Sequence, residues 1–314
     1  AERYLGITTS TAAHASAVNR ILGDPNAIKR HVDAIVAAAQ QTNAAGVHLD
    51  YAAVDPARRA AFTSLVEQLA AQLRATKRGL VVTVATPPSA NDTGGYDWAP
   101  LAAAADGLWL RPPSDPAVFY ELLEPALVAR RDSGFDLRKV SLVLDRRSHD
   151  HTTEGVSTVS LQDALANASV LQARIDQTIA PGREVTIVGT NIAQEEGDSG
   201  IHWDDRAMSV TYSYAERNNQ HTVWLENRFS MAFRLDLARR YGLGGVTIVG
   251  AAQDEALPDV WNLVARYLEE GRVALELPFG PYLQPQWAAS EGKIDRGASG
   301  GLAVWSAPTR PGVY

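Results

Sequence analysis

The chain of 314 residues contains no cysteine, which excludes disulfide bonds, thiolate nucleophiles and Cys-ligated metal sites. The redox compartment stays undecided, because a cysteine-free chain suits either environment. A basic excess is also missing, since the formal net charge is -7, and we expect no nucleic-acid partner. No apolar run approaches the roughly 18 residues of a membrane span, so none is expected. The start, AERYLGITTS, lacks an initiating Met and a signal-peptide pattern, which is typical of an excised or mature piece.

The composition, with 46% hydrophobic and 21% charged residues, is typical of a globular protein. Six short apolar runs alternate with longer alanine-rich amphipathic segments, a pattern that predicts βα units around a parallel sheet. Each run is nearly continuously apolar, as expected for a strand that is covered on both faces. The predicted strands are Tyr4–Thr9, Val47–Tyr51, Leu80–Ala85, Gly107–Arg111, Val140–Asp145 and Gly245–Gly250.

The pattern changes after Asp145, because residues 183–226 supply strand-like runs that are separated by polar turns instead of helices. We interpret this stretch as an antiparallel insertion. Helical patterns near Phe229–Tyr241 and Val260–Leu268 then flank the last predicted strand. From Gly271 onward glycine, proline and small residues are frequent, which indicates a wrapping tail or the start of a further segment.

One region of the sequence carries a family resemblance. The run GVHLDYAAVDPARRAAF, residues 46–62, resembles the fourth barrel strand and following helix of family-18 glycoside hydrolases, the family of chitinase-like enzymes. The likeness is to the branch found with LysM modules in bacterial cell-wall and spore-peptidoglycan proteins. Residues 21–36, 96–110 and 221–250 resemble further segments of that branch in the same order, so the resemblance spans about residues 4–268.

The resemblance implies a (β/α)8 TIM-type barrel with a small antiparallel α+β insertion before the last strand and an active site at the carboxyl ends of the strands. By this alignment Tyr4–Thr9 is the third strand, so either strands one and two lie outside this chain or the architecture is rearranged. We favour the first interpretation, in which a preceding part of the same polypeptide would be a partner. The expected domains are residues 1–182 for strands three to seven, 183–226 for the insertion, 227–270 for the last strand and helices, and 271–314 for the tail.

The acidic motif of the family, Asp-Gly-x-Asp-x-Asp-x-Glu, aligns with residues 45–52. In the family the Glu is the general acid, and the nearest Asp holds the substrate's own N-acetyl group as the internal nucleophile. Only Asp50 remains, at the position that orients the N-acetyl group. Ala52 replaces the general acid, and an alanine side chain can neither give nor take a proton.

Two further features of the family are replaced. The Met-x-Tyr-Asp motif of strand six becomes Arg111, Pro112, Pro113 and Ser114, which removes the hydroxyl and the acid that steady the acetamido group. The floor tryptophan of strand eight becomes Val249. Three losses at one site predict that the chain has no chitinase-type hydrolysis.

Two other carboxylates are candidates at the site. Asp145 ends the predicted seventh strand, and it forms a displaced catalytic pair with Asp50 in the interpretation of an active enzyme. Glu226 lies where the family also has an acidic residue, and it is a candidate for substrate binding, with a structural role as the alternative. Asp55 is better explained as a helix cap before Pro56.

Arg111 and His48 replace residues that face into the barrel in the family. A guanidinium at position 111 is expected near Asp50, either as a buried ion pair that fills the former cavity or as a site for an anion or a carboxylated sugar. His48 is expected to hydrogen-bond Asp50 or to contact a ligand.

No motif favours a metal or a cofactor. The runs His149–His151 and His202–Asp205 contain metal-ligating residue types, but adjacent loop residues of this kind usually face solvent. Glycine-rich fragments lack the spacing of a phosphate-binding loop. We therefore expect neither a metal nor a cofactor.

Aromatic side chains supply surfaces for sugar rings, and the chain has seven Trp and ten Tyr. Tyr51 and Trp203 are the candidates for sugar contacts, because they lie in or beside segments that border the expected barrel mouth. Trp109 and Trp224 stand between apolar strand residues and are predicted to be buried.

The leading hypothesis is a catalytically inactive family-18-like barrel that binds cell-wall or N-acetylglucosamine glycan, or has a structural role, outside the cell or at its surface. The first alternative is an active glycoside hydrolase that uses displaced carboxylates, Asp50 with Asp145, on an amino-sugar polymer. The second alternative is a protein-interaction barrel whose mouth is plugged by Arg111, Pro112 and Pro113. These hypotheses predict bound intact sugar, cleaved sugar and no glycan binding, respectively.

Overall fold

The structure is a computed structural model that describes residues 2–89, 92–168, 171–191, 201–216, 219–251, 258–275, 277, 287–296 and 302–310. The chain divides into two compact units. Unit 1 comprises Ala1–Arg146 and Ser230–Leu275, and unit 2 comprises Arg147–Phe229 and Glu276–Tyr314.

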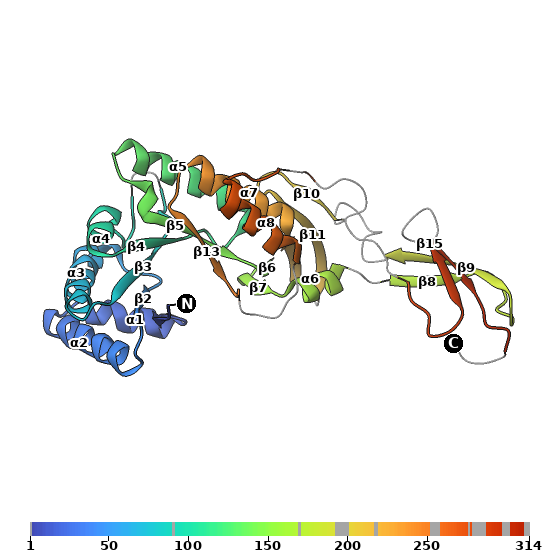
Figure 1. The fold of residues 1–314 in the computed structure, drawn as a ribbon, viewed down its shortest axis with the longest axis horizontal. Coiled ribbons are helices and arrows are strands. Elements are labelled where there is room, and N and C mark those ends of the chain that lie inside the picture. The colour runs from blue at the N-terminus through green and yellow to red at the C-terminus, as the bar shows by residue number, and fades with distance from the viewer. Residues whose placement is uncertain are drawn as a thin grey trace. The chain divides into compact units, whose positions relative to one another are not determined.

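Unit 1 is built on a sheet of six parallel strands in the order β1-β2-β3-β4-β5-β13 (Figure 1). The strands are β1 Tyr4–Thr8, β2 Gly46–Asp50, β3 Gly79–Ala85, β4 Gly107–Arg111, β5 Val140–Asp145 and β13 Gly245–Val249. Each coincides with a predicted strand to within one residue at either end. The α/β class and the parallel half of a TIM-type barrel are therefore confirmed, and β1 and β13 form the two edges of this sheet.

Helices connect β1 to β5 in turn, as expected for βα units, and two more helices precede and follow β13. They are α1 Ala12–Ile21, α2 Pro25–Gln41, α3 Arg59–Ala75, α4 Trp98–Ala104, α5 Phe119–Asp132, α7 Arg228–Arg240 and α8 Pro258–Glu270, with short 3-10 helices at Pro56–Arg58, Pro116–Val118 and Leu137–Lys139. The Asp55 side chain accepts a hydrogen bond from the Ala57 N–H and so caps the turn that leads into α3, as predicted. None of the helices in the described part of the chain is long and apolar enough to cross a membrane.

The two faces of this sheet differ, because successive side chains of a strand point to opposite sides. The face that we call the outer face packs against the helices in one core cluster, and its side chains include Val47, Leu49, Val82, Leu108 and Leu110, each 0% exposed. The other face, called the inner face, is formed by the alternate residues. These include Thr8 of β1, His48 and Asp50 of β2, Val81 and Thr83 of β3, Trp109 and Arg111 of β4, Ser141, Val143 and Asp145 of β5, and Thr247 and Val249 of β13.

Unit 2 contains an antiparallel sheet of five strands in the order β10-β11-β12-β6-β7. The strands are β6 Ser148–Thr152, β7 Gly155–Val159, β10 His202–Asp204, β11 Ser209–Glu216 and β12 Asn219–Leu225. Helix α6, Leu161–Ala168, contributes Ala164 and Ala168 to a small core with Val210, Tyr212 and Val223. This core is separate from the core of unit 1.

A second sheet of unit 2 has four strands in the order β14-β15-β9-β8. They are β8 Leu171–Ile175, β9 Glu184–Asn191, β14 Lys293–Arg296 and β15 Leu302–Ser306. Because β15 pairs with β9 along its whole length, part of the predicted tail 271–314 shares a sheet with the first strand of the predicted insertion 183–226. The antiparallel strands also begin earlier than that insertion, at Ser148. Residues 192–200 and 217–218 of the insertion and 276, 278–286, 297–301 and 311–314 of the tail lie outside the described residues.

Candidate functional site

Asp50 and Arg111 form an ion pair on the inner face of unit 1. Arg111 Nη2 donates a hydrogen bond to Asp50 Oδ1, so the guanidinium reaches across β3 from the last residue of β4 to the last residue of β2. The expected pairing is thus confirmed. The Arg111 side chain is 36% exposed and the Asp50 side chain is 19% exposed, so the pair is not fully buried. An ion pair of this exposure contributes only about 0–1 kcal/mol to stability, and both groups remain partly exposed to solvent.

His48 lies two residues before Asp50 on the same face. Its Nε2 atom is 2.7 Å from the Thr83 hydroxyl oxygen, so the predicted hydrogen bond to Asp50 is replaced by one to the neighbouring strand. Burial lowers the pKa of His48, the Asp50 carboxylate opposes this shift, and the Arg111 guanidinium adds to it. The ring is therefore neutral at pH 7, and it carries one donor and one acceptor nitrogen.

Trp109 is the residue of this site that sequence reasoning missed. We predicted a buried ring, yet the side chain is partly exposed on the inner face, with its ring centroid 4.2 Å from that of His48. The error arose from the apolar neighbours Leu108 and Leu110, which point to the outer face. Strict alternation from Arg111 to Trp109 would have placed both residues on the inner face.

Position 52, which aligns with the general acid of the family-18 motif, is occupied by alanine. Ala52 follows Asp50 by two residues, and its backbone N–H donates to the Thr9 hydroxyl at 2.8 Å. Asp145 is the last residue of β5 and is half-buried on the inner face, with β3 and β4 between it and Asp50. The two carboxylates of the displaced-pair interpretation thus share a face and an end of the sheet, while Asp50 is paired with Arg111.

Tyr51 does not reach the inner face, so its prediction as a sugar-contacting residue is wrong. The side chain is 2% exposed and contacts Phe62 in the helix-covered core. Its hydroxyl is hydrogen-bonded to His31 of α2, and its carbonyl accepts a hydrogen bond of 2.6 Å from the Tyr96 hydroxyl. Burial raises the pKa of Tyr51 and lowers that of His31. The physical reason is alternation: Asp50 points inward, so the next residue points outward.

Glu226 and Trp203 belong to unit 2. Glu226 is 2% exposed, and its backbone N–H donates to the Ser148 hydroxyl at 3.1 Å, so the structural alternative describes it better than contact with a substrate. Trp203 lies on β10 and is partly buried, because it packs against the core of the five-stranded sheet. Trp224 is 5% exposed, as predicted, and its Nε1–H donates to Asp204 at 2.9 Å.

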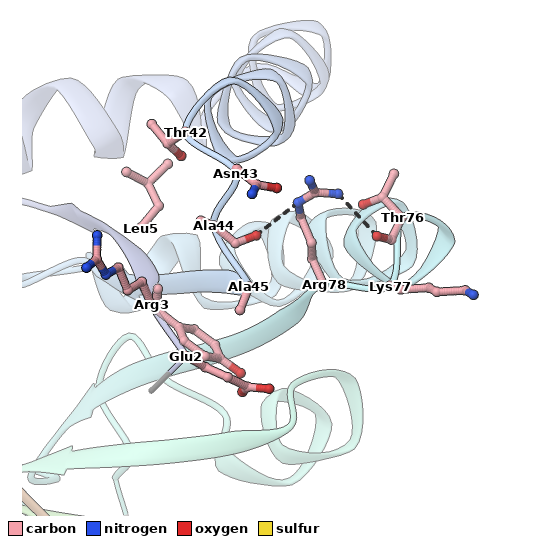
Figure 2. Close-up of a pocket in the computed structure, with 11 residues that line it drawn as sticks. Glu2, Arg3, Leu5, Thr42, Asn43, Ala44, Ala45, Thr76, Lys77 and Arg78 are labelled. Atoms are coloured by element: carbon pink, nitrogen blue, oxygen red, sulfur yellow. Dashed lines mark hydrogen bonds between the residues drawn. The ribbon is translucent and has the colours of Figure 1, made fainter.

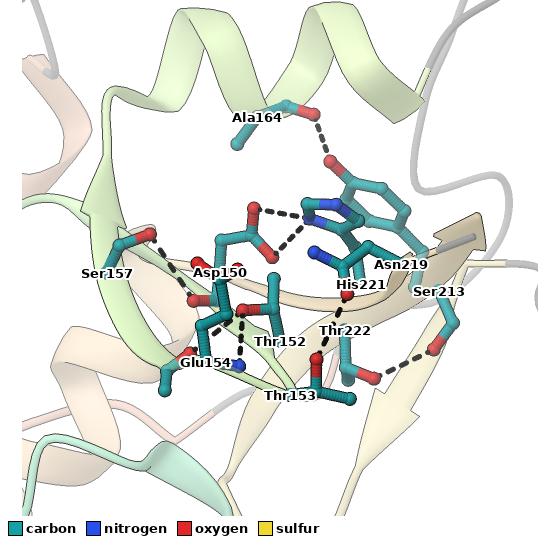
Figure 3. A network of polar contacts seen from close by, with 12 residues as sticks. Asp150, Thr152, Thr153, Glu154, Ser157, Ala164, Ser213, Asn219, His221 and Thr222 are labelled. Carbon is teal, nitrogen blue, oxygen red and sulfur yellow. Dashed lines mark hydrogen bonds and ion pairs between the residues drawn. The ribbon is translucent and has the colours of Figure 1, made fainter. Parts of the chain in front are cut away.

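The run His149–His151 lies within β6, where its side chains alternate between the faces of the five-stranded sheet. Asp150 accepts a hydrogen bond from His221 Nδ1 at 2.8 Å (Figure 3). The His221 ring stacks on Tyr214 with centroids 4.4 Å apart. Adjacent strand residues cannot converge on one ion. Within the described ranges, no group of three or more His, Cys, Asp or Glu side chains could hold a metal.

A cavity of about 720 Å3 lies at the amino ends of β1, β2 and β3 (Figure 2). Arg78 crosses it and donates from Nε to the Ala44 carbonyl and from Nη1 to the Thr76 carbonyl, both at 3.1 Å. These carbonyls follow the carboxyl ends of α2 and α3, where a cation stabilises the helix termini. The cavity is thus at the opposite end of the strands from Asp50, and its cation already has a structural role.

Comparisons with known proteins support the fold. No family model matches the chain. A curated relative, the uncharacterized glycosylase YvbX of Bacillus subtilis, is 21% identical over 247 residues, which cover 73% of this chain and 64% of the relative. The chain therefore spans slightly less than two thirds of the length of that relative.

Among solved structures, a chitinase from Chromobacterium violaceum has a TM-score of 0.62 and 21% identity over 85% of this chain and 80% of that chain. The spore cortex-lytic enzyme SleL of Bacillus megaterium has a TM-score of 0.62 and 17% identity over 83% of this chain and 59% of that chain. The fold implied by the family-18 resemblance, a TIM-type barrel with an antiparallel insertion, is thereby confirmed.

Proposed function

We propose that this chain binds an amino-sugar glycan on the inner face of its parallel sheet and does not hydrolyse it. The observation that carries the proposal is the Asp50–Arg111 ion pair. In the alignment with the family motif, Asp50 occupies the position of the acid that orients the N-acetyl group. The ligand class is a polymer or oligomer that contains N-acetylglucosamine. Glu226 and Tyr51 are not part of this proposal, because both are buried.

The ion pair offers an acceptor and a donor side by side. An acetamido group presents an N–H and a C=O, which match the Asp50 carboxylate and the Arg111 guanidinium, respectively. In the family a tyrosine hydroxyl steadies this group, and Arg111 takes over the donor role in our proposal. The partial exposure of both side chains supports access by a ligand.

The absence of hydrolysis is supported by Ala52 at the general-acid position. General acid catalysis requires a group that carries a proton and lies within hydrogen-bond reach of the leaving oxygen. Alanine has no such group, and Asp50 is held by Arg111. A second candidate, an active hydrolase that uses displaced carboxylates, is favoured by one observation, namely that Asp50 and Asp145 both end strands on the inner face.

The names of the similar structures support the ligand class and the place of action. A chitinase acts on chitin, and a spore cortex-lytic enzyme acts on the spore cortex. We propose that this chain likewise meets its glycan outside the cell or at the cell surface. A preceding part of the same polypeptide, which would add strands beside β1, remains a proposed partner.

The test is titration calorimetry with the soluble tetramer of N-acetylglucosamine, followed by mass spectrometry of the recovered sugar. We expect saturable heat with intact sugar. Hydrogen bonds to charged groups contribute about 1.5–3 kcal/mol, so Asp50→Asn and Arg111→Met should each raise Kd about tenfold or more.

Unit 1 supplies a matched control pair. Asp136 and Arg138 form an exposed ion pair with a distance of 2.9 Å between Arg138 Nε and Asp136 Oδ1. Asp136→Asn and Arg138→Met should leave Kd unchanged. Cleaved sugar would overturn the proposal in favour of the displaced-carboxylate hydrolase. No heat and no cleavage would favour the protein-interaction barrel instead.

A further inference from the structure

Trp109 occupies an unusual place for a large aromatic residue. It lies in the middle of the inner face, on the third residue of β4, and its side chain is partly exposed. By contrast, Trp98 of the same unit is 1% exposed in the helix-covered core. A partly exposed indole beside polar side chains is typical of a ligand-contacting surface.

The ring of Trp109 is supported from one side by His48. The two ring centroids are 4.2 Å apart with an angle of 47° between the planes. His48 is itself fixed by its hydrogen bond to Thr83, whose side chain is 3% exposed. Trp109 is therefore held in place by a neutral ring that is anchored to the neighbouring strand.

Three inner-face positions near Trp109, on its own strand and on the β5 side, carry small residues. In the sheet register Trp109 is level with Ser141 of β5, and Ser141 is level with Gly245 of β13. Gly107, two residues earlier on β4, would accommodate a Cβ with its nearest neighbour 3.8 Å away. The inner face beside Trp109 thus has no bulky side chain at these three positions.

The ion pair lies next to this ring. Arg111 follows Trp109 by two residues on β4, a rise of about 6–7 Å along the strand. Leu49 is level with Val82, so continuation of this register places Asp50 level with Thr83. Thr83 is level with Trp109, so two strand spacings of about 4.8 Å each separate Asp50 from Trp109. An aromatic surface and an acetamido-matching pair are therefore neighbours on one sheet face.

We propose that Trp109 is the platform on which a pyranose ring of the bound glycan stacks. This inference rests on the proposed function, and it names the residue that sets the position of the sugar. A pyranose ring presents a face of C–H groups, which pack against the face of an indole, while its acetamido group reaches Asp50 and Arg111. The platform comes from β4, and not from β13, where Val249 stands at the position of the family's floor tryptophan.

The experiment compares Trp109 with Trp203, the platform candidate of unit 2. Kd for the N-acetylglucosamine tetramer is measured by calorimetry on the full chain with Trp109→Ala, Trp109→Phe and Trp203→Ala. We expect Trp109→Ala to raise Kd at least tenfold, Trp109→Phe to raise it two- to fivefold, and Trp203→Ala to leave it unchanged. Circular dichroism of each variant checks that it is folded.

Tryptophan fluorescence of the unmodified chain gives an independent readout. We expect the tetramer to change the emission, and we expect this change to disappear in Trp109→Phe but to remain in Trp203→Ala. A Kd within twofold of the unmodified value in Trp109→Ala, together with a loss of affinity in Asp50→Asn, would overturn the platform and leave the proposed function standing. Absence of binding by the unmodified chain would overturn both.

Discussion

The outer and inner faces of the parallel sheet in unit 1 are made by neighbouring residues of the same strands, yet they have different compositions. Val81 and Val82 show the contrast most directly, since Val82 is 0% exposed on the outer face and Val81 is partly exposed on the inner face. The outer face is nearly all Val and Leu, whereas the inner face carries charged, aromatic, hydroxyl and glycine positions. The difference separates two sets of side chains: the outer face supplies the core, and the inner face carries the polar and aromatic side chains of the proposed glycan site.

The largest expected effect comes from truncating these two valines. Val82→Ala removes two methyl groups from a fully buried site, which costs about 2 kcal/mol of unfolding free energy through lost transfer energy and a cavity. Val81→Ala should cost less than about 1 kcal/mol, because its side chain is only partly buried. Urea denaturation followed by circular dichroism measures both.

This pair of variants is its own control, since both remove the same atoms and the same β-propensity from one strand. Equal destabilisation by Val81→Ala and Val82→Ala would contradict the comparison. It would mean that the inner face is packed as tightly as the outer face, as in the filled interior of a closed barrel.

A smaller effect on stability is expected from the ion pair of the inner face. Asp50→Asn should change the unfolding free energy by less than about 1 kcal/mol, because a partly exposed pair is screened by solvent. The same substitution should weaken glycan binding about tenfold. Asp50→Asn should therefore affect binding more than stability, whereas Val82→Ala should mainly affect stability. A loss of several kcal/mol in urea denaturation of Asp50→Asn would show that the pair belongs to the core.

The outer face explains why the fold of unit 1 was predictable from the sequence. Runs such as VSLVLD and GLWLR alternate with helical stripes, and their burial by helices is a local consequence of the hydrophobic pattern. The six strands followed from this pattern. The four-stranded sheet did not, because β15 joins β9 across more than a hundred residues and no local pattern specifies that pairing.

The candidate site was predictable only in part. The position of Asp50 and the proximity of Arg111 followed from the aligned motifs, and the structure places the two together. Tyr51 and Trp109 were exchanged in our interpretation, since we assigned Tyr51 to the site and Trp109 to the core. The alternation of side chains along a strand determines which face each of the two residues occupies. The apolar neighbours of Trp109 obscured this pattern in the sequence.

Acid should weaken the fold through two histidines, one on each side of the sheet. Burial lowers the pKa of His31, which contacts Tyr51 of the core, and of His48 on the inner face. In the unfolded chain both rings take up a proton near pH 6.5, whereas the folded chain resists protonation until lower pH. The unfolded state then binds more protons, so the unfolding free energy should fall as pH drops below about 6.5 and level off below the folded pKa values.

Ring resonances followed by NMR between pH 4 and 8 measure the two histidines separately. Both should titrate below pH 6.5, and His48→Gln and His31→Gln should each reduce the acid-induced loss of stability measured by urea denaturation. A His48 resonance that titrates above pH 6.5 would show that the Asp50 carboxylate outweighs burial. The inner face would then be more solvated than its half-buried side chains indicate.

The smallest expected effect is that of placing a carboxyl at position 52, which aligns with the general acid of the family-18 motif. Ala52→Glu should give no measurable release of sugar from the N-acetylglucosamine tetramer, because a general acid must be protonated and a guanidinium nearby favours the ionised form of a carboxyl. Arg111 also holds the carboxylate that would have to orient the acetamido group. The double variant Ala52→Glu, Arg111→Met removes this cation. Any turnover should therefore be higher in the double variant than in Ala52→Glu alone. Turnover by Ala52→Glu alone would mean that a carboxyl at position 52 is the one group that this face needs for hydrolysis, and that Arg111 is compatible with catalysis on this face.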